Sequence, residues 1–134
     1  MKKVTFEEYK EQQFELIKRK DPAIHTKCEV ELYPSFWAVW GYLRAHELFL
    51  NDKFYEARKL SQKVAHETGI EIHPGATIGK GLFIDHGSGV IIGETTIIGD
   101  NVTLYQGVTL GGTGKEQGKR HPTLKDNVMV SAGA

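Results

Sequence analysis

Aliphatic residues recur every six positions through the second half of the chain, from Ile72 to Gly112. A period of six fits neither the 3.6-residue repeat of a helix nor the plain alternation of a strand. It fits a parallel β-helix, in which each six residues form one short strand and one turn, and three strands complete a triangular coil. Only Thr96 departs from the aliphatic pattern. The first positions of the seven repeats are Ile72, Ile78, Ile84, Val90, Thr96, Val102 and Val108.

Gly, Asn and Asp recur between these positions, where a coil must turn a corner and positive φ angles are needed. A set of ordinary glycine-rich hairpins is the alternative, and the constant phase over seven repeats disfavours it. The segment GGTGKEQGKRHP, residues 111–122, interrupts the pattern and predicts a loop that leaves the coil. Leu124 and Val130 then resume the aliphatic position, and the sequence stops at Ala134, part-way through a coil.

The first half of the chain has helical patterns. Thr5 and Glu8 form a capping-box signature before a helix that extends to residue 20. Asp21 and Pro22 would end this helix and begin the next, with Asp21 as its N-cap. Further helices are expected after Pro34 and from residue 54 to 67, and Gly69 would end the last one. We therefore expect an α-helical N-terminal domain at 1–69, and a β-helix at 70–134 with its loop at 111–122.

Two side chains in the helical half have plain structural interpretations. Cys28 is expected to be a small buried hydrophobic residue of a short helix, and His46 to be a packed core or interface histidine.

Charge and composition restrict the function classes. The chain has 17 basic and 17 acidic residues, so it lacks the basic surplus that nucleic acids or anionic membranes attract. No apolar run approaches the roughly 20 residues needed to span a bilayer. The N-terminus has no apolar segment behind its lysines, so a secretory signal is not expected. A single cysteine cannot form an internal disulfide, and we expect a cytoplasmic protein without nucleic-acid or membrane partners.

Polar chemistry must lie at the corners or in the loop, because the coil interior is aliphatic. The loop lacks the Walker pattern, since Thr109 stands in place of the first Gly and Glu116 follows the Lys. Glu71 lies fifteen residues before His86, and an eighteen-residue coil would bring them close together. A carboxylate beside an imidazole favours a general base. A solvated corner histidine is the alternative for His86, and we interpret His73 as structural.

The blocks IEIHPGATIGKGLFIDHGSGVIIGET, VTLGGTGK and KRHP resemble the serine acetyltransferases, a family of hexapeptide-repeat acyltransferases. The resemblance extends from about Asp21 to Ala134. It implies a left-handed parallel β-helix under a helical head, although parallel crossovers are usually right-handed. It also implies O-acetylation of L-serine in cysteine biosynthesis. Acetyl-CoA would be the co-substrate, with no metal and no permanently bound cofactor.

The same resemblance assigns roles to individual residues. It implies that His86 is the general base, that Glu71 orients it, and that His121 contacts the substrate hydroxyl. It implies a clamp for the amino acid in which two carboxylates hold the ammonium group and an arginine holds the carboxylate. The clamp residues would be Asp21, Asp85 and Arg120, and the acetyl-CoA contacts would be Gly112, Thr113, Ala132 and Gly133.

Assembly and partners are also expectations from the resemblance. A homotrimer is expected, with each site between two subunits, while the short helical head leaves a hexamer open. The later coils and the C-terminal tail of the family do not follow Ala134. Docking to O-acetylserine sulfhydrylase is therefore not expected of these residues, and acetyl-CoA binding would be weakened. A sugar or xenobiotic acetyltransferase and an inactive β-helix fragment are the alternatives. A γ-type carbonic anhydrase would need closely spaced metal histidines that His73, His86 and His121 do not provide.

Overall fold

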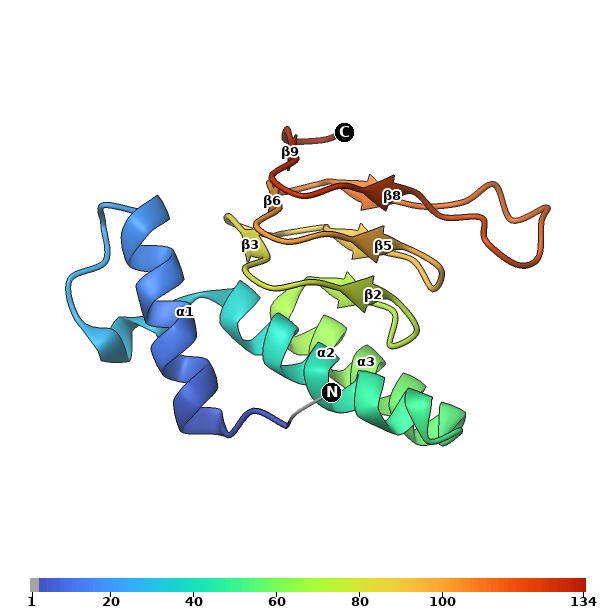
Figure 1. Cartoon of the computed structure of the whole chain (residues 1–134), viewed down its shortest axis with the longest axis horizontal. Coiled ribbons are helices and arrows are strands. Elements are labelled where there is room, and N and C mark those ends of the chain that lie inside the picture. Colours follow the sequence, from blue (N-terminus) through green and yellow to red (C-terminus); the bar gives the residue numbers. More distant parts are fainter. Residues whose placement is uncertain (1–2) are drawn as a thin grey trace.

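The computed structural model describes residues 3–134, which form a helical N-terminal part and a three-sided coil of short parallel strands. The helical part contains α1 (Phe6–Lys20), the 3₁₀ helix η1 (Lys27–Leu32), α2 (Pro34–Leu50) and α3 (Phe54–Thr68). In Figure 1 the coils stack above α2 and α3, while α1 lies beside them at the left.

Strands of two residues each make up the rest of the chain. They pair only with parallel neighbours, in three sheets of order β1-β4-β7, β2-β5-β8 and β3-β6-β9. Residues 111–122 lie between β7 and β8 and project away from the coil at the right of Figure 1, as the interrupted repeat predicted. The strands are β1 (Glu71–Ile72), β2 (Thr77–Ile78), β3 (Phe83–Ile84), β4 (Ile91–Ile92), β5 (Ile97–Ile98), β6 (Thr103–Leu104), β7 (Thr109–Leu110), β8 (Thr123–Leu124) and β9 (Met129–Val130).

The first coil is longer than the eighteen residues expected from the repeat. Glu71 pairs with Ile91, twenty positions later, whereas Ile91 pairs with Thr109, eighteen positions later. The two extra residues fall in the corner between β3 and β4, which contains the segment HGSG, residues 86–89. The expectation of a uniform eighteen-residue coil was therefore wrong for the corner that carries His86.

The sequence hides this insertion because each repeat buries two side chains, two positions apart. Ile70 and Ile72 are both buried in the first coil, and Val90 and Ile92 are both buried in the second. After an insertion of two residues, the six-residue series that includes Ile72 continues at Val90, the other inward position of the second coil. The aliphatic pattern therefore continues unbroken in the sequence. The true partner of Ile72 is Ile92 rather than Val90.

The ends of the helices follow local chemistry, with one exception. The capping box of Thr5 and Glu8 is confirmed, and Gly69 ends α3 at a φ of 75°. No helix begins at Pro22, however, because the Asp21 carboxylate accepts the N–H of Ala23 in an isolated turn. The expectation of a buried Cys28 was also wrong, since this residue is exposed on η1.

Hydrogen bonds join the helices to the first coil. His46 lies buried with its Nδ1 2.7 Å from the Pro74 carbonyl oxygen, which confirms it as a packed histidine. The hydroxyl of Tyr42 donates to the carbonyl of Ala76, and that of Ser61 donates to the carbonyl of Ile72. These bonds satisfy carbonyls at the first edge of the coil, and one hydrophobic core continues from the helices into it. We retain a boundary near residue 69 as a prediction.

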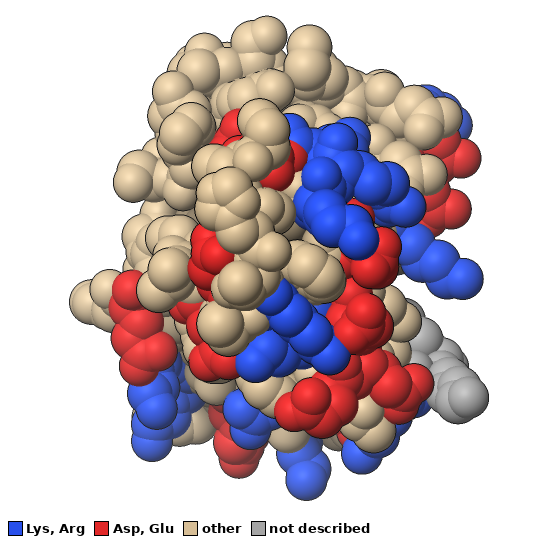
Figure 2. Space-filling model, turned by 90° about the vertical axis from the view of Figure 1, so that its left-hand side faces the viewer, with Lys and Arg blue, Asp and Glu red and all other residues tan. Residues whose placement is uncertain are grey.

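Charges of both signs are mixed on the face shown in Figure 2, and no single sign dominates it. None of the described helices is long and apolar enough to cross a membrane.

The buried Thr96 hydroxyl yields a prediction about stability. Thr96 is 1% exposed, and its Oγ1 has no hydrogen-bond partner among the described residues. We expect Thr96→Val to raise the free energy of unfolding by about 1–3 kcal/mol, because a buried unpaired polar group is removed at constant shape. Urea denaturation at fixed protein concentration measures the change.

Thr103→Val is the matched control, since the Oγ1 of Thr103 accepts a hydrogen bond from Lys20. It should be neutral or destabilising. A Thr96→Val protein less stable than wild type would show that this hydroxyl has a partner in solution.

Candidate functional site

Two columns of corners flank the sheet β1-β4-β7. In the first column three backbone N–H groups donate to backbone carbonyl oxygens one coil below. The pairs are Gly89 to Gly69, Gly107 to Ser88, and Gly133 to Gln106. The four glycines in these pairs have φ angles of 73–79°, so backbone lies against backbone with no Cβ between. In the second column the N–H of His73 donates to Ile92, and that of Gly93 to Leu110. Each candidate site residue belongs to one of these columns or lies beside it.

The first half-site, as we call Asp21, Tyr33, Asp85 and His86, lies beside the first column. Asp85 and His86 follow β3, and Nε2 of His86 is 3.9 Å from a carboxylate oxygen of Asp85. His86 has a φ of 64°, a left-handed conformation that is uncommon outside glycine and that occurs often at functional sites. Its side chain is 73% exposed. A strained, outward-facing imidazole beside a carboxylate is suited to proton transfer rather than to packing.

Tyr33 connects Asp21 to this half-site. The Tyr33 hydroxyl donates to the Asp21 carboxylate at 2.6 Å, and this bond lowers the pKa of Asp21, aided by the N–H of Ala23. Burial raises the pKa of Tyr33 above its usual range, and the carboxylates of Asp21 and Asp85 add to the effect. Tyr33 was not identified as a site residue from the sequence, where it stands out only as the residue before the helix expected after Pro34.

The second half-site, as we call His73, Glu94, Thr95, Arg120 and His121, lies at the other column. The Arg120 guanidinium donates to the Glu94 carboxylate at 2.7 Å, and this bond lowers the pKa of Glu94. The hydroxyl of Thr95 accepts the backbone N–H groups of Arg120 and His121. Burial lowers the pKa of both His73 and His121, and nearby arginines add to the effect. Glu94 and Thr95 were not identified as site residues from the sequence. Both lie at the end of the block IEIHPGATIGKGLFIDHGSGVIIGET, which carries part of the family resemblance.

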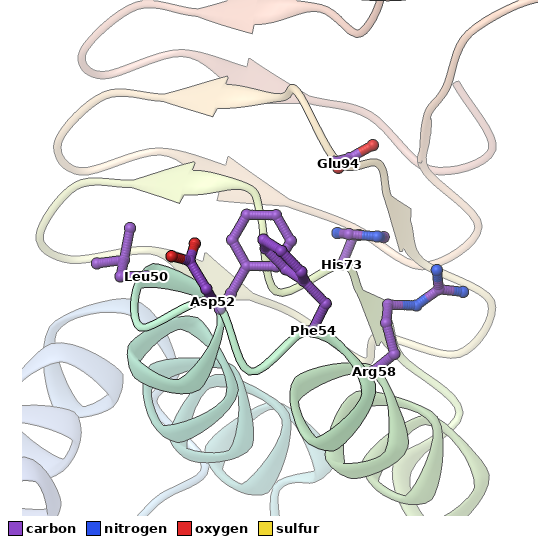
Figure 3. A pocket seen from close by; sticks show the side chains of 7 residues that line it. Leu50, Asp52, Phe54, Arg58, His73 and Glu94 are labelled. Atoms are coloured by element: carbon purple, nitrogen blue, oxygen red, sulfur yellow. The ribbon is translucent and has the colours of Figure 1, made fainter.

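A pocket of about 540 Å³ adjoins the second half-site, between the helices and the first coil. In Figure 3, Arg58 from α3 and His73 from the coil lie on the same side of the pocket, with Glu94 above them. The ring of Phe49 lies edge-on to that of His73, with the two ring centroids 5.8 Å apart. The lining residues are Phe49, Leu50, Asp52, Phe54, Arg58, His73 and Glu94.

The two half-sites do not meet within one chain. Among residues 3–134, no hydrogen bond or ion pair joins Asp21, Asp85 or His86 to Arg120 or His121. Figure 1 shows the corner after β3 at the left and the loop at the right, on opposite sides of the coil. The four acetyl-CoA candidates divide in the same way: Gly112 and Thr113 begin the loop, and Ala132 and Gly133 lie in the first column.

Glu71 remains only a predicted partner of His86. It begins β1, one coil below Ile91, and across the described residues it makes no hydrogen bond or ion pair with the imidazole. The part of the chain that the structure describes also contains no group of three His, Cys, Asp or Glu that could hold a metal ion.

Comparison with known proteins gives one consistent result. No family model matches the chain. The chain is 60% identical over 120 residues to a serine acetyltransferase of Staphylococcus xylosus, covering 89% of this chain and 56% of that protein. The serine acetyltransferase of Neisseria gonorrhoeae, solved with serine, superposes with a TM-score of 0.87 at 35% identity, over 95% of this chain and 52% of that one.

A third match is isoform 3 of the Entamoeba histolytica serine acetyltransferase, solved in complex with cysteine. Its TM-score is 0.86 at 39% identity, over 94% of this chain and 45% of that one. The resemblance inferred from the sequence blocks is therefore confirmed. The chain spans about half the length of the curated relatives it matches.

The lowered pKa values of the partly buried His73 and His121 predict how stability depends on pH. The pKa of His73 and of His121 is lower in the folded state than the ordinary value of 6.5, so the unfolded chain binds protons more readily. Stability should therefore be complete above pH 6.5 and decrease as the pH falls below it. Glu94 should stay ionised as the decrease begins, because its pKa lies below the ordinary 4.5.

Urea denaturation at pH 7.5 and pH 5.5 measures this decrease. His73→Gln should reduce the difference between the two pH values. A difference unchanged by that substitution would assign the pH dependence to other groups.

Proposed function

We propose that this homologue of the serine acetyltransferases transfers the acetyl group of acetyl-CoA to the hydroxyl of L-serine. The products would be O-acetylserine and CoA, the first step of cysteine biosynthesis. One observation carries the proposal beyond sequence similarity: the protein presents two half-sites of complementary chemistry. Two carboxylates with a histidine lie at one corner, and an arginine with a histidine lies at the other. A zwitterionic amino acid needs both kinds of partner.

The residues divide between binding and chemistry. Asp21 and Asp85 would hold the ammonium group of serine, and Arg120 its carboxylate, in the two-pronged geometry that a guanidinium offers. The ionic bond to Glu94 fixes Arg120 in place, and Tyr33 fixes Asp21. His86 would face the hydroxyl as the general base, with Glu71 as its orienting carboxylate, and His121 would contact the reacting oxygens.

The proposed reaction is a direct transfer. His86 removes the proton of the serine hydroxyl while its oxygen forms a bond to the thioester carbonyl carbon. The resulting oxyanion collapses and breaks the bond from carbon to sulfur, and the CoA thiolate takes the proton back from His86. Cys28 has no role in this scheme, because its only side-chain hydrogen-bond contact among the described residues is with Thr26.

A trimer would complete the site, with the first half-site of one subunit facing the second half-site of its neighbour. The exposure of His86 in a single chain supports this arrangement, because a general base works best where water is excluded. Ile91 and Ile97 are 41% and 42% exposed on the outer faces of two sheets, where a neighbouring subunit would cover them. The glycines of the first column would leave room for the acetyl-CoA arm beside Ala132 and Gly133, and Gly112 and Thr113 would approach it from the partner.

Three finer features are also proposed. The left-handed sense of the coil rests on the family resemblance, a division into domains near residue 69 on the change of sequence pattern, and a cytoplasmic location on the single cysteine.

The first functional prediction concerns His86. We expect His86→Asn to reduce the rate of CoA release with serine by about 10²- to 10⁴-fold, because the general base is lost. Asparagine tolerates a positive φ, so the corner should keep its conformation and the unfolding midpoint should not change. A thiol-release assay with acetyl-CoA and a panel of amino-acid, sugar and amine acceptors measures the rate.

Serine should be the preferred acceptor of the wild-type protein. Preference for a sugar or amine would contradict the amino-acid clamp, and a His86→Asn rate above about a tenth of wild type would exclude His86 as the base.

The second functional prediction concerns the shared site. Inactive His86→Ala and His121→Ala chains, refolded together in equal amounts, should regain about a quarter of the wild-type rate. Random mixing gives three mixed trimers in four, each with one intact site out of three. Activity that stays at the level of the separate variants, or a monomer in sedimentation at micromolar concentration, would show that no site is shared.

A further inference from the structure

Thr95 makes an unusual number of contacts to the end of the loop. It lies in the corner between β4 and β5, and its Oγ1 accepts the N–H of Arg120 at 3.0 Å and the N–H of His121 at 2.9 Å. The same oxygen lies 2.8 Å from Nδ1 of His121, and the backbone N–H of Thr95 donates to that Nδ1 at 3.1 Å. One residue thus holds the backbone and the ring of its partner, 26 positions away in sequence.

These contacts decide which ring nitrogen of His121 carries the proton. A backbone N–H can only donate, so Nδ1 must be an acceptor without a proton. The two amides of Arg120 and His121 occupy the lone pairs of the Thr95 hydroxyl, so its own proton points toward Nδ1 as well. The neutral ring must then carry its proton on Nε2. Protonating Nδ1 would set an N–H against the N–H of Thr95 and break both contacts.

The surroundings of the ring support the same conclusion. A Cβ on Gly93 would lie 2.2 Å from Nε2 of His121, so the ring can lie over this corner only because residue 93 is glycine. A Cβ on Gly112 would lie 3.7 Å from the same nitrogen, which places the N–H edge beside the start of the loop. The charged groups around the ring are Arg120, Glu94, Lys119 and His73, and burial with the nearby cations keeps the ring neutral by lowering its pKa.

We infer that Thr95 is a positioning residue that fixes His121 as a neutral Nε2–H donor, directed at an oxygen that gains negative charge in the reaction. The inference rests on the proposed acetyl transfer and deepens it by dividing the work of the two histidines. His86 exchanges the proton, and His121 donates a hydrogen bond without titrating. Glu94 and Thr95 are adjacent in the chain, as are Arg120 and His121. Glu94 binds the Arg120 side chain, and Thr95 binds the His121 ring.

The test combines a spectroscopic measurement with kinetics on the full chain. Protein labelled with ¹⁵N-histidine reports the protonation state of each ring nitrogen, and His121→Asn identifies the signal. At pH 7.5 the wild type should have an unprotonated Nδ1 and a protonated Nε2. A protonated Nδ1 in the wild type would overturn the inference by itself, without any variant.

Two variants separate positioning from simple structural support. Thr95→Val keeps the shape and the backbone N–H but loses the hydroxyl that anchors the backbone of Arg120 and His121. The ring should then move away from the Thr95 N–H and sample both tautomers, and kcat should fall by about 10²-fold, as misplaced reacting groups cost. Thr95→Ser keeps the hydroxyl and should restore the wild-type tautomer and most of the rate. Glu94→Gln should instead raise the KM for serine, because it loosens Arg120 and leaves the ring contact intact.

The outcomes distinguish this inference from the proposed function. If the wild type has the predicted tautomer but transfers no acetyl group to serine, the proposed function fails and the positioning by Thr95 stands. If the wild type is active and Thr95→Val keeps both its tautomer and its kcat, only the inference about Thr95 fails. If Thr95→Val does not fold, the wild-type tautomer and the Thr95→Ser rate still decide the question.

Discussion

The ladder of hydrogen bonds from coil to coil is the constraint on which the rest of this protein depends. Each short strand pairs only with the strand one coil below and one coil above, so every corner has a fixed place in a column. Residues some twenty positions apart are thereby held side by side with little freedom. A loop can leave the coil at residue 111 and return at residue 122 without disturbing this order, because β8 is fixed on β5. Arg120 and His121, at the end of the loop, therefore lie at a fixed position in the second column, beside Glu94 and Thr95.

This architecture separates charges that a small zwitterion would bring together. The chain has no net charge, yet the carboxylates of Asp21 and Asp85 gather at one column and the guanidinium of Arg120 at the other. Within one subunit the sheet β1-β4-β7 lies between them. On the proposed function, assembly itself would create the recognition site, and the substrate would bridge two chains. Each half-site would have to be rigid before assembly, which is the role of the bonds from Tyr33 and Glu94.

Much of this organisation could be predicted from the sequence, because short-range chemistry controls it. The capping box of Thr5, the terminal glycine of α3 and the aliphatic period each depend on residues close in the chain, and each was confirmed. The environment of Cys28 could not be predicted, because its burial depends on what η1 packs against rather than on its own polarity. Asp21 was expected to cap a helix, and the structure instead places its carboxylate between an amide and the Tyr33 hydroxyl.

The candidate site was predictable residue by residue only through the family resemblance. The contacts that orient its side chains were not, because they join residues that only the ladder brings together. Thr95 and Thr96 are consecutive, and the six-residue phase marks Thr96 as an inward position, where it is buried without a partner among the described residues. No local signal shows that Thr95 holds the end of the loop. The direction in which each side chain faces depends on the phase of the coil.

The two surplus residues in the corner after β3 have a consequence for how this protein could change over evolutionary time. Inward and outward positions alternate along each strand, so gaining or losing residues in pairs leaves the interior filled with the same kinds of side chain. Inserting or deleting a single residue would instead direct the inward side chains of the next strand outward. Corners are therefore places where the chain can vary in steps of two while the hydrophobic interior is preserved. The corner that carries His86 has two extra residues and a left-handed residue, while β4 and β7 above it still pair at the eighteen-residue spacing.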